Sequence, residues 1–347
     1  MKETHSLEQK PKIQPLLGDS ARKSKPALRI LADPIFLFGA PRSFTSVVGT
    51  MLGQHPELYG LPETHLFGCK TMAEWWGVCE EQTFPRADGL VRTVAELFFG
   101  GQNAWTVKLA GGWLRRRSHF STGLLMEALS ERVHPRVVVD KSPSVVYSLH
   151  FMERIHRLFP RARFIHLLRH PRAHGESVMR FIEERRSHGP IPASHWLLHL
   201  ATFPDLSGAS SESIERSSEL DPQFGWYVLN RNIQEFFELL PEAQKLSVRG
   251  EDLLQSPDES LRQIVSWLGV RADPEATEEM KHPERSPYAC FGPPGARYGN
   301  DSFFLESPAL HPARAKPQSL DGALSWRADG GDFLPEVKQL AREFGYQ

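Results

Sequence analysis

The sequence has few cysteines and no metal-ligand spacing, and these shortages exclude several kinds of site. Its 347 residues include three cysteines, Cys69, Cys79 and Cys290, which are widely spaced and contain no Cys-x-x-Cys pair. This pattern argues against a disulfide framework and against a zinc site. The 15 histidines are scattered without a ligand spacing, so we expect no bound metal.

Long apolar runs and an excess of charge are also lacking. No run approaches the ~20 apolar residues that a membrane span needs, and the N-terminus lacks the apolar core of a signal peptide. The formal net charge is −1, and no basic stripe with interleaved aromatics is visible, so we expect no nucleic-acid partner. The expectation is a cytoplasmic protein without a membrane partner, whose oligomeric state the sequence does not fix.

The order of apolar and polar segments predicts one large domain behind a tail. Residues 1–29 are polar and rich in lysine and proline, which is typical of a disordered tail. Apolar strands then alternate with helical segments, so we expect 30–347 to form an α/β domain with a P-loop-like central parallel sheet flanked by helices. Within it, 187–221 is predicted to be a lid-like insertion and 281–334 a long irregular C-terminal segment.

More local expectations follow from the same patterns. Strands are predicted at 35–38, 58–61, 104–109, 137–140, 164–169 and 245–248, the third of them ending near Lys108. Pro62 stands where it opens a helix that carries Glu63, Thr64 and His65.

The first predicted strand leads into the stretch that shows most about function. Four apolar residues, Ile35 to Phe38, are followed by a turn and by a helix that starts near Phe44. The loop consists of Gly39, Ala40, Pro41, Arg42, Ser43, Phe44, Thr45 and Ser46. A strand, a tight turn and a helix N-terminus gather unpaired backbone N–H groups into an anion-binding cradle.

The side chains of this loop suit a phosphate or sulfate group. Arg42 supplies a planar cationic fork, and Ser43, Thr45 and Ser46 add hydroxyl donors. The second glycine and the lysine of the ATP-binding loop are absent, which disfavours a nucleoside triphosphate. An ordinary strand-to-helix turn with a surface arginine is the alternative.

Two further predicted strands end in cations. Lys141 follows 137–140, and Arg169 closes 164–169. Sites in parallel sheets lie at the carboxyl ends of the strands, where Arg42 is also expected. Ser177 lies eight positions after Arg169, about two helical turns on, so both donors are able to hold one phosphate. A structural ion pair for Arg169 and a plain helix residue for Ser177 are the alternatives.

Taken together, these segments resemble the sulfotransferases that use 3′-phosphoadenosine 5′-phosphosulfate (PAPS). Gly39 to Ser46 is similar to their 5′-phosphosulfate loop, with Phe44 where glycine is commoner, and Phe164 to Ser177 is similar to their 3′-phosphate element. Asp140-Lys-Ser-Pro143 resembles a motif between the two, and Lys245 to Leu268 resembles a late strand and helix of the family.

The resemblance implies roles for individual residues. Arg42, Ser43, Thr45 and Ser46 would hold the 5′-phosphosulfate, and Arg169 with Ser177 the 3′-phosphate of PAPS and of its product, 3′,5′-adenosine bisphosphate. Arg297, in a late glycine-containing loop, would complete the 3′-phosphate site. Sulfuryl transfer depends mostly on positioning and charge stabilisation, which gives Arg42 and Lys141 a role at the leaving group.

The acceptor hydroxyl also needs a proton acceptor. Glu63 and His65 are the candidates, because Pro62 to Phe67 is similar to the segment that carries a glutamate base in sugar-sulfating members. A carboxylate at a helix N-terminus is the alternative for Glu63, and a core or surface histidine for His65. Lys108 is a weaker candidate for a contact with the acceptor, and an ordinary exposed lysine is the alternative interpretation.

The acceptor itself is the least defined part. Gly299 to Leu305, Leu320 to Trp326 and Phe344 to Tyr346 resemble the C-terminal segments of bacterial polyketide and nonribosomal-peptide sulfotransferases. That resemblance implies a small-molecule or carrier-bound acyl hydroxyl, in secondary metabolism. A P-loop kinase-like phosphotransferase and a non-catalytic protein that binds adenosine bisphosphate are the alternative functions.

Overall fold

The centre of the molecule is a five-stranded parallel sheet. The computed structural model describes residues 32–81, 87–187, 221–312 and 318–347. The strands are β1 (Ile35–Phe38), β2 (Leu58–Gly60), β3 (Val137–Asp140), β4 (Arg163–Leu168) and β5 (Lys245–Arg249). They are ordered β2-β3-β1-β4-β5, and every neighbouring pair is parallel. The predicted α/β fold is therefore confirmed, and β1 lies in the middle of the sheet.

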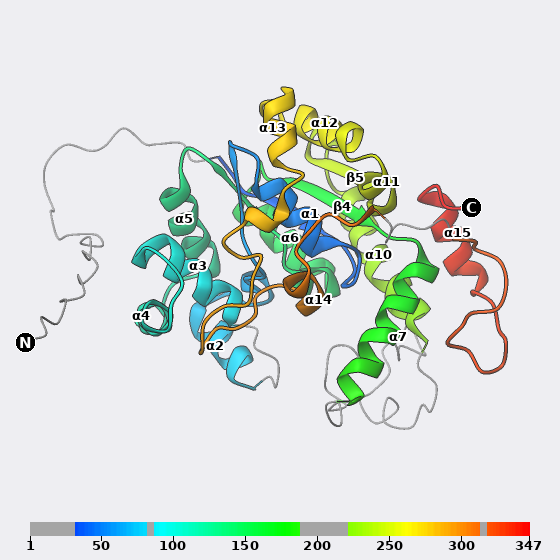
Figure 1. The fold of residues 1–347 in the computed structure, drawn as a ribbon, viewed down its shortest axis with the longest axis horizontal. Helices are drawn as coiled ribbons and strands as arrows, with labels where there is room; N and C mark the ends of the chain where they lie inside the picture. Colours follow the sequence, from blue (N-terminus) through cyan, green and yellow to red (C-terminus); the bar gives the residue numbers. More distant parts are fainter. Residues whose placement is uncertain (1–31, 82–86, 188–220, 313–317) are drawn as a thin grey trace, which may run out of the picture.

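Helices cover both faces of this sheet (Figure 1). Their bounds are α1 (Thr45–Gly53), α2 (Met72–Glu81), α3 (Asp88–Phe99), α4 (Ala104–Arg115), α5 (Thr122–Val133), α6 (Leu149–Leu158), α7 (Pro171–Ser187), α10 (Pro222–Glu238), α11 (Gly250–Gln255), α12 (Pro257–Leu268), α13 (Pro274–Glu279), α14 (Ser302–Glu306) and α15 (Pro335–Glu343). Figure 1 shows α2 to α5 at one end of the molecule and α7 and α15 at the other. None of the helices in the described ranges is long and apolar enough to cross a membrane.

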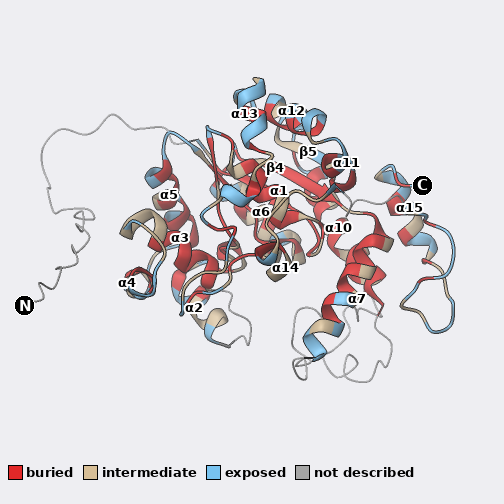
Figure 2. Ribbon diagram, in the orientation of Figure 1, coloured by how far each residue is buried: buried red, intermediate tan, exposed pale blue. Residues whose placement is uncertain are grey.

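The unbroken apolar run of β1 is explained by burial on both sides. Phe36 and Phe38 point into a core shared with α2 to α7 and α10, and Phe36 stacks on Phe164 of β4 with ring centroids 5.7 Å apart. Ile35 and Leu37 point the other way, into a core with α1, α11 and α12. Period-two alternation sends successive side chains to opposite faces, so a strand covered twice must be apolar throughout. Figure 2 shows the central strands almost wholly buried and the edge strand β5 only partly so.

Residues 104–109 are not a strand. They begin α4, where the Asn103 side chain accepts hydrogen bonds from the N–H groups of Trp105 and Thr106, and the Thr106 hydroxyl accepts one from the N–H of Asn103. This reciprocal capping box stabilises a helix start and outweighs the β propensity of the following residues. Lys108 is exposed on α4 and does not line the cavity described below.

Pro62 does not open a helix either. The N–H groups of Thr64 and His65 donate to the Ser142 hydroxyl, at 3.1 and 3.0 Å, and the N–H of Glu63 donates to the carbonyl of Gly299 at 2.7 Å. These long-range partners take the groups that a helix would use, and a short 3₁₀ turn follows only at Leu66–Gly68.

Other expectations agree with the structure or lie outside it. The segment 281–334 is mostly irregular in its described part, with the short helix α14 inside it. The tail 1–29 lies outside the described residues, as does nearly all of the insertion 187–221, so both stay predictions.

Helix α1 packs against β2 through two glycines, which gives a stability prediction. A Cβ atom at Gly53 would lie 2.6 Å from the Cα and N atoms of Gly60. We expect Gly53→Ala to lower the free energy of unfolding by about 1–3 kcal/mol, because backbone has to move to relieve the overlap. Gly77→Ala on α2 is the matched control, since its Cβ meets nothing within 4 Å. The control should be about 0.5–1 kcal/mol more stable than the parent in chemical denaturation; equal effects of the two variants would contradict the packing argument.

Candidate active site

The loop after β1 has an unusual backbone. Arg42 and Phe44 have φ angles of 72° and 63°, in the left-handed region that favours glycine. Non-glycine residues remain there only where their surroundings hold them, at a cost of about 1–3 kcal/mol each. The Phe44 ring lies 4.2 Å from the Arg169 guanidinium, and a Cβ on Gly250 would come within 2.6 Å of that ring. Phe44 is therefore held in a backbone conformation that favours glycine, because the Arg169 guanidinium and the backbone of Gly250 pack against its ring.

Residues from β4 and α7 support the same loop. Arg169 Nη1 donates to the carbonyl oxygen of Arg42, and His174 Nε2 donates to that of Pro41 at 3.0 Å. Burial, followed by the positive charges of Arg169 and Arg42, lowers the pKa of His174 to about 3, so this imidazole is neutral. The strand ends of β1 and β4 are therefore joined directly, as expected for neighbouring strands of a parallel sheet.

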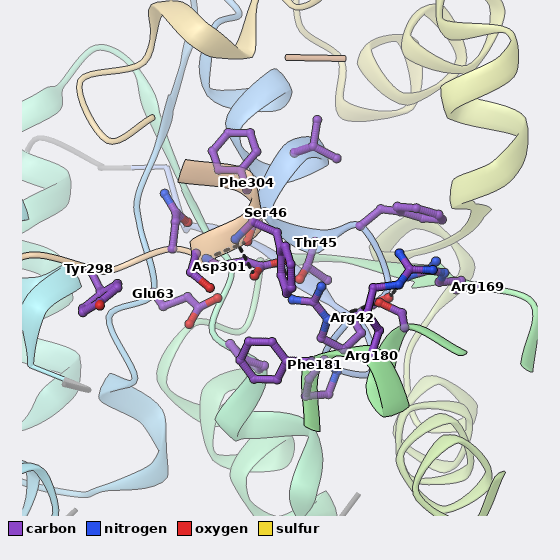
Figure 3. Close-up of a pocket in the computed structure, with 18 of the residues that line it drawn as sticks. Arg42, Thr45, Ser46, Glu63, Arg169, Arg180, Phe181, Tyr298, Asp301 and Phe304 are labelled. Carbon is purple, nitrogen blue, oxygen red and sulfur yellow. Dashed lines mark hydrogen bonds and ion pairs between the residues drawn. The ribbon is translucent and has the colours of Figure 1, made fainter. Parts of the chain in front are cut away.

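Three of the predicted phosphate ligands, Arg42, Arg169 and Ser177, line the same cavity in this region. Arg42 Nε donates to Ser177 Oγ at 3.3 Å, and Arg169 lies beside Arg42, as Figure 3 shows. Burial, together with repulsion from Arg42 and Arg180, lowers the pKa of Arg169 to about 10, so it stays cationic at neutral pH. Its Nε is buried and has no hydrogen-bond partner among the described residues. Positive charge and an unused donor thus converge at the C-terminal ends of β1 and β4.

Lys141 and Glu63 form a buried ion pair beside the loop. Lys141 Nζ lies 2.6 Å from Glu63 Oε1 and 2.9 Å from Ser46 Oγ, and the lysine side chain is 1% exposed. Burial raises the pKa of Glu63, but the opposing effects of Lys141 and His65 are larger and lower it to about 2. Glu63 is therefore a carboxylate at every physiological pH, with a lysine bridging it to the loop.

His65 follows two residues later in the same turn. Its Nε2 lies 3.4 Å from Glu63 Oε2, and its Nδ1 lies 3.1 Å from Ser144 Oγ. Its φ angle of 51° is also left-handed. The N–H groups of this turn donate to the Ser142 hydroxyl, which in turn donates to Asp140 at 3.3 Å. Asp140-Lys-Ser142 thus shapes the segment that presents Glu63 and His65.

The opposite wall comes from a segment far along the chain, residues 287–303. Buried Arg92 of α3 donates to the carbonyl oxygens of Pro287 and Tyr298, at 3.2 and 2.9 Å, and Asp88 accepts from the N–H of Tyr298 at 2.8 Å. This anchoring brings Asp301 to the loop, where its Oδ2 lies 2.5 Å from Arg42 Nη1. Asp301 was not among the predicted site residues, because no spacing connects it to Arg42.

These elements enclose one large cavity of about 880 Å³. The predicted residues that line it are Pro41, Arg42, Phe44, Thr45, Ser46, Glu63, His65, Arg169, Ser177 and Arg297. The others, Gly39, Ala40, Ser43 and Lys141, are buried and are not among the lining residues. Arg297 reaches the lining with its guanidinium 5.1 Å from the centre of the Phe291 ring.

Sequence reasoning missed several residues of the lining. Arg180 and Phe181 come three and four positions after Ser177 on α7, and that helical spacing places them on the same face. Aromatic side chains make up much of the remaining wall, namely Tyr147, Phe181, Phe291, Tyr298, Phe303 and Phe304. Among the described residues, no group of three or more His, Cys, Asp or Glu side chains is placed to hold a metal ion.

The chain is similar to known proteins in sequence and in fold. A family model described as "Sulfotransferase family" matches residues 34–274. A sulfotransferase domain from the curacin biosynthetic pathway has a TM-score of 0.68 at 22% identity, over 91% of this chain and 99% of that one. The sulfotransferase domain of the Synechococcus PCC 7002 olefin synthase has a TM-score of 0.65 at 24% identity, over 94% and 99%. No curated protein matches the chain.

Proposed function

The chain belongs to the sulfotransferase family, and from this premise we propose that it transfers a sulfuryl group from PAPS to a hydroxyl group of a small molecule or a carrier-bound acyl chain. The observation that carries the proposal is the meeting of the β1 loop with Arg169 and Ser177 around one cavity. Backbone N–H groups at a helix start and cations at neighbouring strand ends suit a ligand with separate anionic groups.

The residues present fit such a donor. Arg169 Nε is a buried donor without a described partner, and Ser177 lies two turns along the helix that follows. These groups would hold the 3′-phosphate, while the loop with Arg42, Thr45 and Ser46 would hold the phosphosulfate. PAPS supplies an electrophilic sulfur and a phosphate leaving group. Arg297 stays a proposed further ligand of the 3′-phosphate.

Lys141 and Glu63 have complementary roles in this proposal. Lys141 contacts both Ser46 of the loop and Glu63, so it lies between the anion site and the candidate base. A lysine there stabilises charge on the leaving oxygen. Glu63 then accepts the proton of the acceptor hydroxyl. The Glu63 carboxylate becomes more basic when the Lys141 ammonium interacts with the bound PAPS instead of with Glu63. His65, 3.4 Å from Glu63, is the other candidate for the base.

The aromatic side of the cavity supports an apolar acceptor. Tyr147, Phe291, Phe303 and Phe304 line the same cavity as Glu63 and the loop. Apolar walls with few polar groups are typical of pockets for small organic molecules and acyl chains. The two similar folds come from the curacin pathway and an olefin synthase, which favours a carrier-bound acyl substrate.

A transfer assay tests the proposal. We expect labelled sulfate to pass from PAPS to one member of a panel of carrier-linked acyl, phenolic, steroid and sugar hydroxyls, with release of adenosine bisphosphate. Labelled ATP is the control and should give no transfer. Transfer from ATP would indicate a kinase-like enzyme, and tight binding of adenosine bisphosphate without turnover on any acceptor would indicate a non-catalytic protein.

A further inference from the structure

Four side chains of the protein contact the Arg42 guanidinium. The rings of Phe181 and Phe303 each lie 5.0 Å from it. Its Nε donates to Ser177 at 3.3 Å, and its Nη1 lies 2.5 Å from Asp301 Oδ2. The cation predicted to receive the phosphosulfate is therefore already paired with a carboxylate.

Asp301 reaches this position without help from Arg42. It caps α14 by accepting a hydrogen bond from the N–H of Phe303 at 3.2 Å, and its own N–H lies 3.4 Å from Ser46 Oγ. The preceding residues are fixed as well, because Gly299 accepts from Glu63 and Asn300 Nδ2 donates to Tyr288 at 3.0 Å. Figure 3 shows Asp301 directed between Ser46 and Arg42.

Arg42 in turn has other groups to orient it. Ser177, two aromatic rings and the contact of its carbonyl with Arg169 fix both ends of the residue. Asp301 is thus not needed to aim the guanidinium. What Asp301 adds is a negative charge at the place where the cofactor brings further negative charge.

We propose that Asp301 is an internal competitor for Arg42, which limits how tightly the site holds adenosine bisphosphate and so promotes release of the product. The inference rests on the proposed function, because it takes the phosphosulfate to bind at this loop. The Asp301 carboxylate and a phosphate group bound at Arg42 would both be negative and would repel each other. This repulsion is strong where water is partly excluded, and the side chains of Arg42 and Asp301 are only 12% and 25% exposed. Each time the product leaves, the carboxylate takes back the cation.

Asp301→Asn removes the charge and keeps the helix cap, because asparagine caps as well as aspartate. We expect the Kd of 3′,5′-adenosine bisphosphate, measured by calorimetry, to fall about tenfold, or about 1.4 kcal/mol. The KM for PAPS should fall with it. The kcat should not rise, because a product that binds more tightly is released more slowly. Inorganic pyrophosphate is the second probe and should also bind more tightly to this variant.

Two variants control for charge. Glu306→Gln removes an exposed carboxylate from the end of the same helix, at the rim of the cavity, and should change the Kd by less than about twofold. Asp301→Glu keeps the charge and should stay near the parent value. Weaker or unchanged binding by Asp301→Asn, or equal effects of Asp301→Asn and Asp301→Glu, would overturn the inference.

The outcome for the proposed function is read separately. If the parent binds pyrophosphate but not adenosine bisphosphate, and Asp301→Asn tightens the pyrophosphate complex, the donor assignment falls and the competition for Arg42 stands. If the parent binds adenosine bisphosphate and the variant binds it no better, the competition alone is wrong. If neither anion binds to any variant, both are wrong.

Discussion

Glu63→Gln is expected to lower turnover with PAPS by about 10²–10⁴-fold, the usual contribution of a general base. The amide oxygen still accepts a hydrogen bond from Lys141, so the buried lysine, 1% exposed, keeps a partner. Binding of adenosine bisphosphate should therefore change little, since Glu63 is not among the proposed phosphate ligands. Single-turnover kinetics with calorimetry on the same preparation measure both quantities.

The pH dependence separates Glu63 from His65. The pKa of Glu63 is lowered to about 2, so as the base it stays ionised and kcat/KM should be flat between about pH 5 and 7. A histidine base would lose activity as the pH falls and the imidazole takes up a proton, so kcat/KM would show an acid limb. His65→Gln is the matched variant. Full turnover in Glu63→Gln, with an acid limb that vanishes in His65→Gln, would move the base to His65.

Arg169→Ala is expected to weaken binding of adenosine bisphosphate by about tenfold or more. A hydrogen bond to a charged group contributes about 1.5–3 kcal/mol, and 1.4 kcal/mol is a factor of ten. The variant also loses the contacts of Arg169 with the Arg42 carbonyl and the Phe44 ring, which hold the left-handed loop. The loss therefore combines a missing ligand with a less ordered cradle.

Arg169→Lys and an exposed arginine serve as its controls. The lysine keeps the charge without the planar fork, so binding intermediate between the parent and Arg169→Ala is expected. Arg157→Ala changes a half-exposed arginine on α6, whose side chain is 57% exposed, and should bind like the parent. Unaltered binding in a folded Arg169→Ala variant would remove the 3′-phosphate assignment.

The sheet and its cation-bearing ends could be predicted because the signals are local. The apolar run of β1, the glycine-led turn and the strand-Arg-helix-Ser spacing each lie within about fifteen residues, and in a parallel sheet their ends must meet. The resemblance to sulfotransferases drawn from those segments is confirmed by the family match over 34–274. The roles of the individual residues stay predictions.

The errors have a common physical cause. In both mispredicted segments, backbone N–H groups donate to partners that residue propensities cannot predict. At 62–65 the partners are Ser142 and Gly299, and at 104–109 the partner is the Asn103 cap. Asp301 was missed for a similar reason. Its position depends on buried Arg92, more than two hundred residues earlier in the chain, and a contact of that range leaves no period in the sequence.

The anchoring of 287–303 by α3 has a consequence for how such a protein diversifies. Apart from Arg297, the groups proposed to hold the donor lie at the strand ends and in the helices that follow them. Phe291, Tyr298 and Phe303 of the lining belong instead to residues 287–303, which Arg92 and Asp88 of α3 hold in place. We therefore expect substitutions within 287–303 to change the lining of the cavity without disturbing the strands of the sheet. Such substitutions would change which acceptors fit the cavity. A substitution at Asp301 would also affect the donor site, because Asp301 contacts Arg42.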